Sequence, residues 1–152
     1  MAIEIAKGEP ERLDIEVLNT KFEELMECDF INIDKESLRT PKIYFEVQRE
    51  LQNQTRSLQF WYQRAAELKE RRRLYYSGRL PARHYQQEPL PYPPQNATET
   101  NECLKADKLL QECDKYVKEA EMRVKLCEDT LSMVKSRHWD LKNVITYRMM
   151  ME

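Results

Sequence analysis

The strongest constraint on the fold is a run of small apolar residues spaced alternately four and three positions apart. The run comprises Ala106, Leu110, Cys113, Val117, Ala120, Val124, Cys127, Leu131 and Val134. A period of 3.5 residues predicts a long α-helix whose apolar seam packs on other helices with a left-handed supercoil. Small side chains allow a close approach of helices, which suits a multi-helix assembly better than an isolated dimer.

The partner of this seam remains open. The residues from Leu110 to Val134 would join copies of the chain in a homo-oligomer, with Leu110, Cys113, Val117, Ala120, Val124, Cys127, Leu131 and Val134 as the oligomer seam. They would equally well pack inside one chain against an earlier helix. The pattern does not separate these two interpretations, and both can hold together.

Turn-forming residues are too sparse for a sheet protein. The chain has two glycines, and five of its seven prolines fall within residues 81–94. A sheet needs many turns, whereas a chain of long helices needs few, so we predict an all-α fold in a single domain. Charged residues make up 34% of the sequence, and no apolar run approaches the roughly 20 residues of a membrane span.

Four segments follow from periodicity and helix-end signals. Residues 10–27 predict an acidic amphipathic helix within a region, residues 1–40, of net charge −6. This helix either packs on its own domain or forms an acidic arm for a basic partner. Residues 36–77 predict a long helix with a basic end, in which Thr40-Pro41 is a start signal that would place the first turn at Pro41. Gly78 predicts its end.

The remaining segments are a loop and a second long helix. Residues 80–101 hold Pro81, Pro89, Pro91, Pro93 and Pro94, a density that predicts a loop without helix or central strand. Residues 102–150 predict the heptad helix and a methionine-rich helical tail, which is either ordinary core or an adaptable contact surface.

A basic segment, residues 64–83, stands out on a chain of net charge −2. Its seven cations against two acids give a net charge of +5. Guanidinium groups suit phosphate because they stay charged and donate in a fixed fork, and tyrosine rings offer faces on which unpaired bases stack. The alternative is a solvated helix end whose cations favour the C-terminal dipole. The predicted DNA-binding residues are Lys69, Arg71, Arg72, Arg73, Tyr75, Tyr76, Arg79 and Arg83.

Catalytic and metal-binding patterns are absent from the sequence. There is no phosphate-binding loop, nucleophile elbow, zinc-protease motif or calcium loop, so we expect no catalytic residues, no cofactor and no enzymatic activity. The four cysteines form no C-x-x-C pair, and no secretory signal opens the chain, so we expect reduced thiols and no metal site.

Several stretches of the chain form an ordered set: residues 30–34, the helix start at 41–44, Tyr-Tyr-Ser-Gly-Arg at 75–79, and residues 134–145 with a final Arg148. In this order they resemble the UvsY family of recombination mediators from myovirus-type tailed phages. The correspondence covers about residues 10–150 apart from the proline-rich segment, which is longer than is usual in the family. One of the family's DNA-contacting cations corresponds to Arg72, while another falls on Glu70.

The resemblance implies an α-helical accessory protein of DNA recombination and repair. It implies binding to single-stranded DNA and assembly into a ring-like homo-oligomer, a hexamer or heptamer. It also implies action on a RecA-like recombinase, which would be loaded onto strands coated by single-strand-binding protein in the cytoplasm of the infected bacterial host. A different class remains open: a non-catalytic coiled-coil adaptor whose basic patch docks on an acidic protein.

Overall fold

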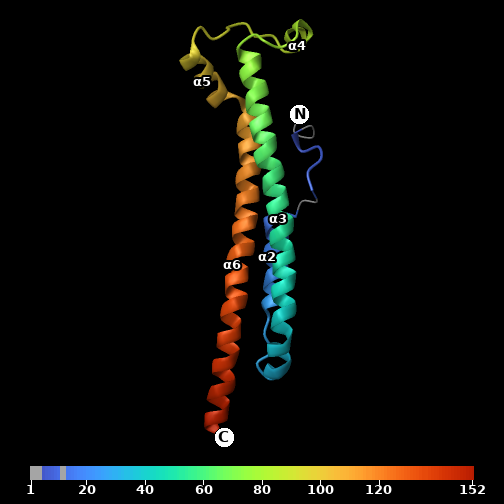
Figure 1. Cartoon of the computed structure of the whole chain (residues 1–152), viewed down its shortest axis with the longest axis vertical. Coiled ribbons are helices and arrows are strands. Elements are labelled where there is room, and N and C mark those ends of the chain that lie inside the picture. The colour runs from blue at the N-terminus through green and yellow to red at the C-terminus, as the bar shows by residue number, and fades with distance from the viewer. Residues whose placement is uncertain (1–4, 11–12) are drawn as a thin grey trace. The chain divides into compact units, whose positions relative to one another are not determined.

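The computed structural model describes residues 5–10 and 13–152 of the chain. Its main elements are α2 (Ile15–Met26), α3 (Ile33–Tyr76), α4 (Ala82–Gln87), α5 (Ala97–Ala106) and α6 (Lys108–Met151), shown in Figure 1. The described residues contain no strand, so the predicted all-α fold is confirmed.

Contacts between the helices divide the chain into two compact units. Unit 1 consists of Met1–Glu9 and Gln59–Lys118, and unit 2 consists of Pro10–Leu58 and Glu119–Glu152. The long helices α3 and α6 each supply residues to both units, so neither unit is a continuous stretch of sequence.

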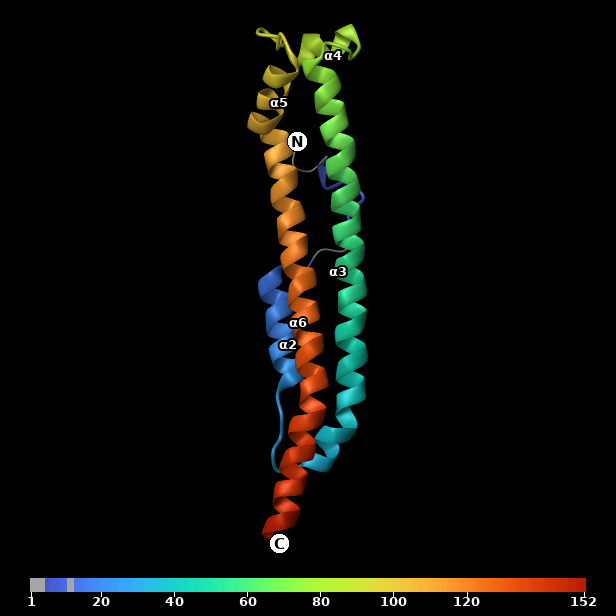
Figure 2. The same ribbon diagram turned by 60° about the vertical axis from the view of Figure 1, so that its left-hand side comes forward.

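The core of unit 2 forms where α2 packs against α3 and α6, which lie side by side with it in Figures 1 and 2. Its buried members come from all three helices: Leu18, Phe22, Ile43, Val47, Cys127 and Val134. Burial in this core raises the pKa of the Cys127 thiol to about 12. An apolar environment disfavours the thiolate, so Cys127 is a packing residue rather than a reactive one.

The core of unit 1 is built around Trp61, which has no exposed surface. Its ring stacks on that of Tyr116, with the ring centroids 4.6 Å apart, and its Nε1 donates to Glu9 Oε1 at 2.7 Å. Cys113 and Val117 of α6 are buried in the same unit. The indole thus gains both its apolar contacts and the hydrogen bond that a buried N–H requires.

The heptad seam of α6 is filled from within the chain. Cys113, Val117, Ala120, Cys127 and Val134 are buried in a single copy, while Leu110, Val124 and Leu131 are half-buried. Coiled-coil-like packing is therefore present inside each unit. A homo-oligomer stays a prediction, and it would have to use other surfaces or open these contacts.

The long helix α3 begins at Ile33, earlier than the predicted bound at residue 36 and than the start signal at Thr40-Pro41. Pro41 lies inside the helix and not in its first turn. Tertiary contacts account for the extra turns, because Ile33 is buried and Arg137 of α6 binds both the carboxylate of Glu36 and Thr40 Oγ1. A proline has no N–H to give an interior helix bond, but long-range packing outweighs that local loss here.

The prediction that residues 80–101 hold no helix was wrong. Pro81 directly precedes the six-residue helix α4. Proline is tolerated there because the first backbone N–H groups of a helix have no intrahelical acceptor, so the missing N–H costs no hydrogen bond. Further along, Asn96 caps α5, its Oδ1 accepting from Glu99 N at 2.9 Å, so that this helix starts at Ala97 and not at residue 102.

The ends of the other predicted helices also differ. The chain breaks between α5 and α6 at Asp107, whose Oδ1 accepts from the backbone N–H groups of Leu109 and Leu110, so the predicted helix over 102–150 is interrupted. The helix predicted over 10–27 spans Ile15–Met26, and positions 11–12 of that prediction lie outside the described residues.

Candidate nucleic-acid interface

The basic end of α3 closes with a glycine turn in unit 1. Gly78 adopts a φ of +74°, and a β-carbon there would meet no atom within 4 Å, so backbone conformation is what favours glycine. Arg79 N donates to Leu74 O at 3.0 Å and Gly78 N to Tyr75 O at 3.1 Å. This pair of bonds is a Schellman motif, which satisfies the last carbonyls of the helix and confirms the predicted stop.

Arg72 is held at the centre of an ion-pair cluster and is only 7% exposed. Its Nε donates to Asp107 Oδ2 at 2.7 Å, and its two terminal nitrogens donate to Glu88, at 3.1 and 2.9 Å. Asp107 caps α6 and Glu88 ends α4, so Arg72 ties three parts of unit 1 together. Each of the three guanidinium nitrogens thus donates to a carboxylate oxygen.

The two tyrosines pack against the same cluster. Tyr75 is buried, donates to the carbonyl of Pro89 at 3.1 Å, and stacks on Tyr85 with ring centroids 5.5 Å apart. Tyr76 donates to Asp107 Oδ2 at 2.7 Å, and burial together with this hydrogen bond raises its pKa to about 12. Both rings are engaged in internal packing, so in this conformation they lend the helix end rigidity.

The remaining predicted cations lie at the surface. Lys69 and Arg71 are exposed on the last turns of α3, Arg79 on the glycine turn and Arg83 on the first turn of α4. Among the described residues, no ion pair includes any of these four. Arg73 is also exposed, but its guanidinium binds Glu70 at 2.6 Å. The predicted set therefore divides into four unpaired cations, two paired arginines and two packed tyrosines.

A small cavity lies between Arg71, one of the four surface cations, and the buried cluster around Arg72. Arg71, Arg72, Arg64 and Glu88 line a cavity of about 210 Å³ in unit 1, together with His84. The Nε2 atom of His84 lies 3.3 Å from Glu88 Oε2. The sequence analysis missed Glu88 and Asp107, because nothing local marks an acid 16 or 35 residues away as a partner of Arg72.

The carboxylates of the cluster should make unit 1 sensitive to acid. The hydrogen bonds from Arg72 lower the pKa of Glu88 below its ordinary 4.5. Since the unfolded chain then binds more protons than the folded one, stability from this contact is present above pH 4.5 and is lost as the pH falls through the folded pKa. The difference in unfolding free energy between wild type and Glu88→Gln, measured by urea titration, should therefore shrink on acidification. A difference that is independent of pH would contradict this.

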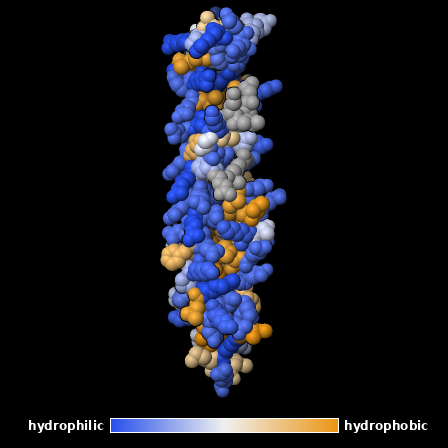
Figure 3. Space-filling view, turned by 90° about the vertical axis from the view of Figure 1, so that its right-hand side faces the viewer, coloured by the Kyte–Doolittle hydropathy of each residue, from blue (hydrophilic) through white to orange (hydrophobic). Residues whose placement is uncertain are grey.

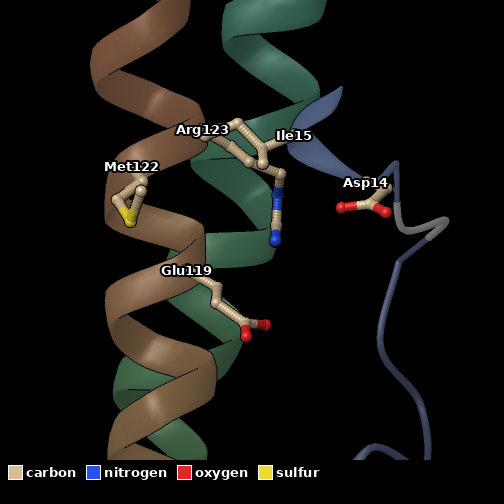
Figure 4. A pocket seen from close by; sticks show the side chains of 5 residues that line it. All are labelled: Asp14, Ile15, Glu119, Met122 and Arg123. Atoms are coloured by element: carbon tan, nitrogen blue, oxygen red, sulfur yellow. The ribbon is translucent and has the colours of Figure 1, made fainter. Parts of the chain in front are cut away.

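Unit 2 contains a larger cavity of mixed character. It has a volume of about 560 Å³ and is lined by Asp14, Ile15, Glu119, Met122 and Arg123. Figure 4 shows Glu119 and Arg123 projecting from α6 toward the segment that carries Asp14. The guanidinium of Arg123 is buried and donates to Gln54 and Ser57 of α3. This cation therefore serves helix packing.

Other kinds of site are not found in the part of the chain that the structure describes. No group of three or more histidine, cysteine, aspartate or glutamate side chains there is arranged to hold a metal ion. Over the same residues, every helix is too short or too polar to cross a membrane. The four cysteines are free thiols.

The described residues thus define an all-α protein whose long helix α3 ends in exposed cations without ion-pair partners. The family model described as "Recombination, repair and ssDNA binding protein UvsY" matches residues 21–152, and the chain belongs to this family. Searches of the curated proteins and of the solved structures found no match. The resemblance seen in the sequence is thus confirmed, and nothing in the described residues points to enzymatic activity.

Proposed function

We propose that this protein is a recombination mediator that binds single-stranded DNA through the end of α3 and the adjoining turn. In this proposal the strand's phosphates contact Lys69, Arg71, Arg79 and Arg83. The observation that carries it is the exposure of these four cations without carboxylate partners. They lie beside the ion-pair cluster around Arg72, which holds the helix end in place. The family's description supports the choice of ligand.

Arg72 has a supporting role in this proposal. Its bonds to Asp107 and Glu88 hold α4 and the start of α6 against α3, which keeps the four surface cations in place. Arg73 is the remaining predicted contact. Its guanidinium binds a phosphate only if it gives up the ion pair with Glu70, and the loss of an exposed ion pair costs little free energy. Tyr75 and Tyr76 act as packing residues.

The mediator role itself follows from differential binding rather than catalysis. A mediator favours the strand ready for the recombinase over the strand coated by single-strand-binding protein, so it needs affinity but no reactive group. A RecA-like recombinase and the single-strand-binding protein are accordingly the proposed protein partners. Repetition of the patch in a ring of six or seven copies would raise avidity through effective concentration. The proposed location is the cytoplasm of the infected bacterial host.

A salt titration tests the DNA-binding part of this proposal. The fluorescence anisotropy of a labelled thymidine oligonucleotide should rise with protein at low ionic strength. The logarithm of the association constant should fall with the logarithm of salt concentration, and the four cations should contribute about −3 to the slope, since each neutralised phosphate contributes about −0.7. If the protein is instead an adaptor whose basic patch docks on an acidic protein, we expect no DNA binding at any salt concentration. That result would overturn the proposal.

A functional assay tests the recombinase part. With single-strand-binding protein prebound to circular single-stranded DNA, adding this protein should shorten the lag before a RecA-like recombinase begins ATP hydrolysis. The same recombinase on naked DNA is the control, and it should gain little. An unchanged lag on the coated strand would limit the protein to DNA binding.

A further inference from the structure

The C-terminal part of α6, in unit 2, carries an exposed tryptophan. Trp139 is 62% exposed, whereas Trp61, the other tryptophan of the chain, has no exposed surface. A tryptophan ring that stays in water is available to a partner, and tryptophan is enriched at interfaces because it joins a large apolar surface to a polar N–H. Figure 3 shows one face of the molecule, which is mainly hydrophilic with separate apolar patches.

Two lysines flank this ring on the same side of α6. Lys135 precedes Trp139 by four residues and Lys142 follows it by three, spacings that place all three on one helix face. Lys142 Nζ lies 5.1 Å from the centroid of the indole ring. The residues between them that point inward, Arg137 and Leu141, are buried at 6% and 4% exposure. We call Lys135, Trp139 and Lys142 the tryptophan stripe.

The charges of the two lysines in the stripe are not neutralised by neighbouring carboxylates of the described residues. In the described part of the chain, no ion pair involves Lys135 or Lys142, whereas the nearby Arg137 is neutralised by Glu36. Asp140 is the one acid between Lys135 and Lys142 in the sequence. It lines a separate cavity with Met133, Ser136 and Val144, on another flank of the helix. The stripe therefore offers two cations without carboxylate partners, one of which lies over the indole ring, and the opposite face of that ring.

From this arrangement we propose that the tryptophan stripe is a second contact for single-stranded nucleic acid, in which an unpaired base stacks on Trp139 and adjoining phosphates bind Lys135 and Lys142. Base–aromatic stacking tolerates any sequence, and lysines beside the ring suit the charged backbone. A duplex would fit poorly, since its bases are already stacked. An acidic protein surface would satisfy the lysines but would leave the ring without a specific partner. The site adds to the contact proposed at the end of α3 and rests on the same ligand.

Intrinsic fluorescence offers a direct test, because the buried Trp61 is shielded from a bound strand. Titration of the full-length protein with a thymidine oligonucleotide should quench part of the tryptophan emission. In Trp139→Phe, which leaves Trp61 as the only tryptophan, this quenching should disappear, and affinity by anisotropy should fall about fivefold or more in Trp139→Ala. Lys135→Gln with Lys142→Gln should reduce the steepness of the salt slope by about 1.4.

Heparin and polyglutamate serve as controls without bases. Heparin should bind by charge but should leave the emission of Trp139 unquenched, because it has no ring to stack. The proposal is overturned if the oligonucleotide binds without quenching, if Trp139→Ala binds as tightly as wild type, or if polyglutamate produces the same quenching. Binding without quenching would leave the contact at α3 intact, while an absence of all binding would remove both.

Discussion

Replacing Arg72 with alanine should lower the free energy of unfolding by about 3–5 kcal/mol, the range measured when one partner of a buried ion pair is removed. The substitution leaves Asp107, whose side chain is 2% exposed, with a buried charge that has lost its guanidinium partner. It also frees Glu88 and removes the cation that lies 4.3 Å from the ring centroid of Tyr75. Urea unfolding followed by far-ultraviolet circular dichroism measures the loss.

The adjacent residue supplies the matched control. Arg73 has the same chemistry and one residue's difference in position, but its side chain is 47% exposed and its partner Glu70 is 58% exposed. Because exposed ion pairs contribute little, Arg73→Ala should change the stability far less than Arg72→Ala does. If the two variants were equally stable, the assignment of Arg72 to a structural role would be wrong.

Removing the four unpaired cations should abolish most of the electrostatic affinity for single-stranded DNA. In the variant with Lys69, Arg71, Arg79 and Arg83 all replaced by glutamine, the salt slope should become shallower by about 2.8, since each lost phosphate contact removes about 0.7. The affinity at low salt should fall by roughly two orders of magnitude. Anisotropy titrations at several salt concentrations measure both quantities. The fold should survive, because all four side chains are exposed.

A variant of equal charge change separates local contact from overall charge. Lys35, Lys42, Arg49 and Arg56 are exposed on α3 within unit 2, and no ion pair in the described residues includes them. Their replacement by glutamine removes the same number of positive charges from the chain as the first variant does. We expect a much smaller loss of affinity. An equal or larger loss would move the DNA contact from the end of α3 to this other part of the helix.

Much of the fold was predictable because its causes are local. The 3.5-residue period identified the packing face of α6, and Gly78 marked the end of α3 because only glycine readily adopts the positive φ of that turn. The errors fell where distant contacts outweigh local preference. The helix α3 extends upstream of Pro41, where Ile33 is buried and Glu36 binds Arg137 of α6. Asp107 interrupts the second long helix and is a partner of Arg72.

The candidate site also has features that the local sequence predicts and features that only distant contacts decide. Counting charges located the basic segment at residues 64–83, because cations close together in the sequence on a helix stay close in space. The count could not tell Arg72 from Arg71 or Arg73. Burial and pairing depend on Glu88 and Asp107, which only the folded chain brings to Arg72.

By itself, then, the amino-acid sequence determined that the chain is helical, where its seam lies, where the first long helix stops and that its end is basic. Each of these depends on backbone preference or periodicity within a few turns. The tertiary structure alone decided which arginine is locked in a carboxylate cluster, which cations remain free, and that the seam is filled by the chain's own helices. Those outcomes depend on which distant residues meet, since an ion pair or an apolar contact forms only between groups that the fold places together.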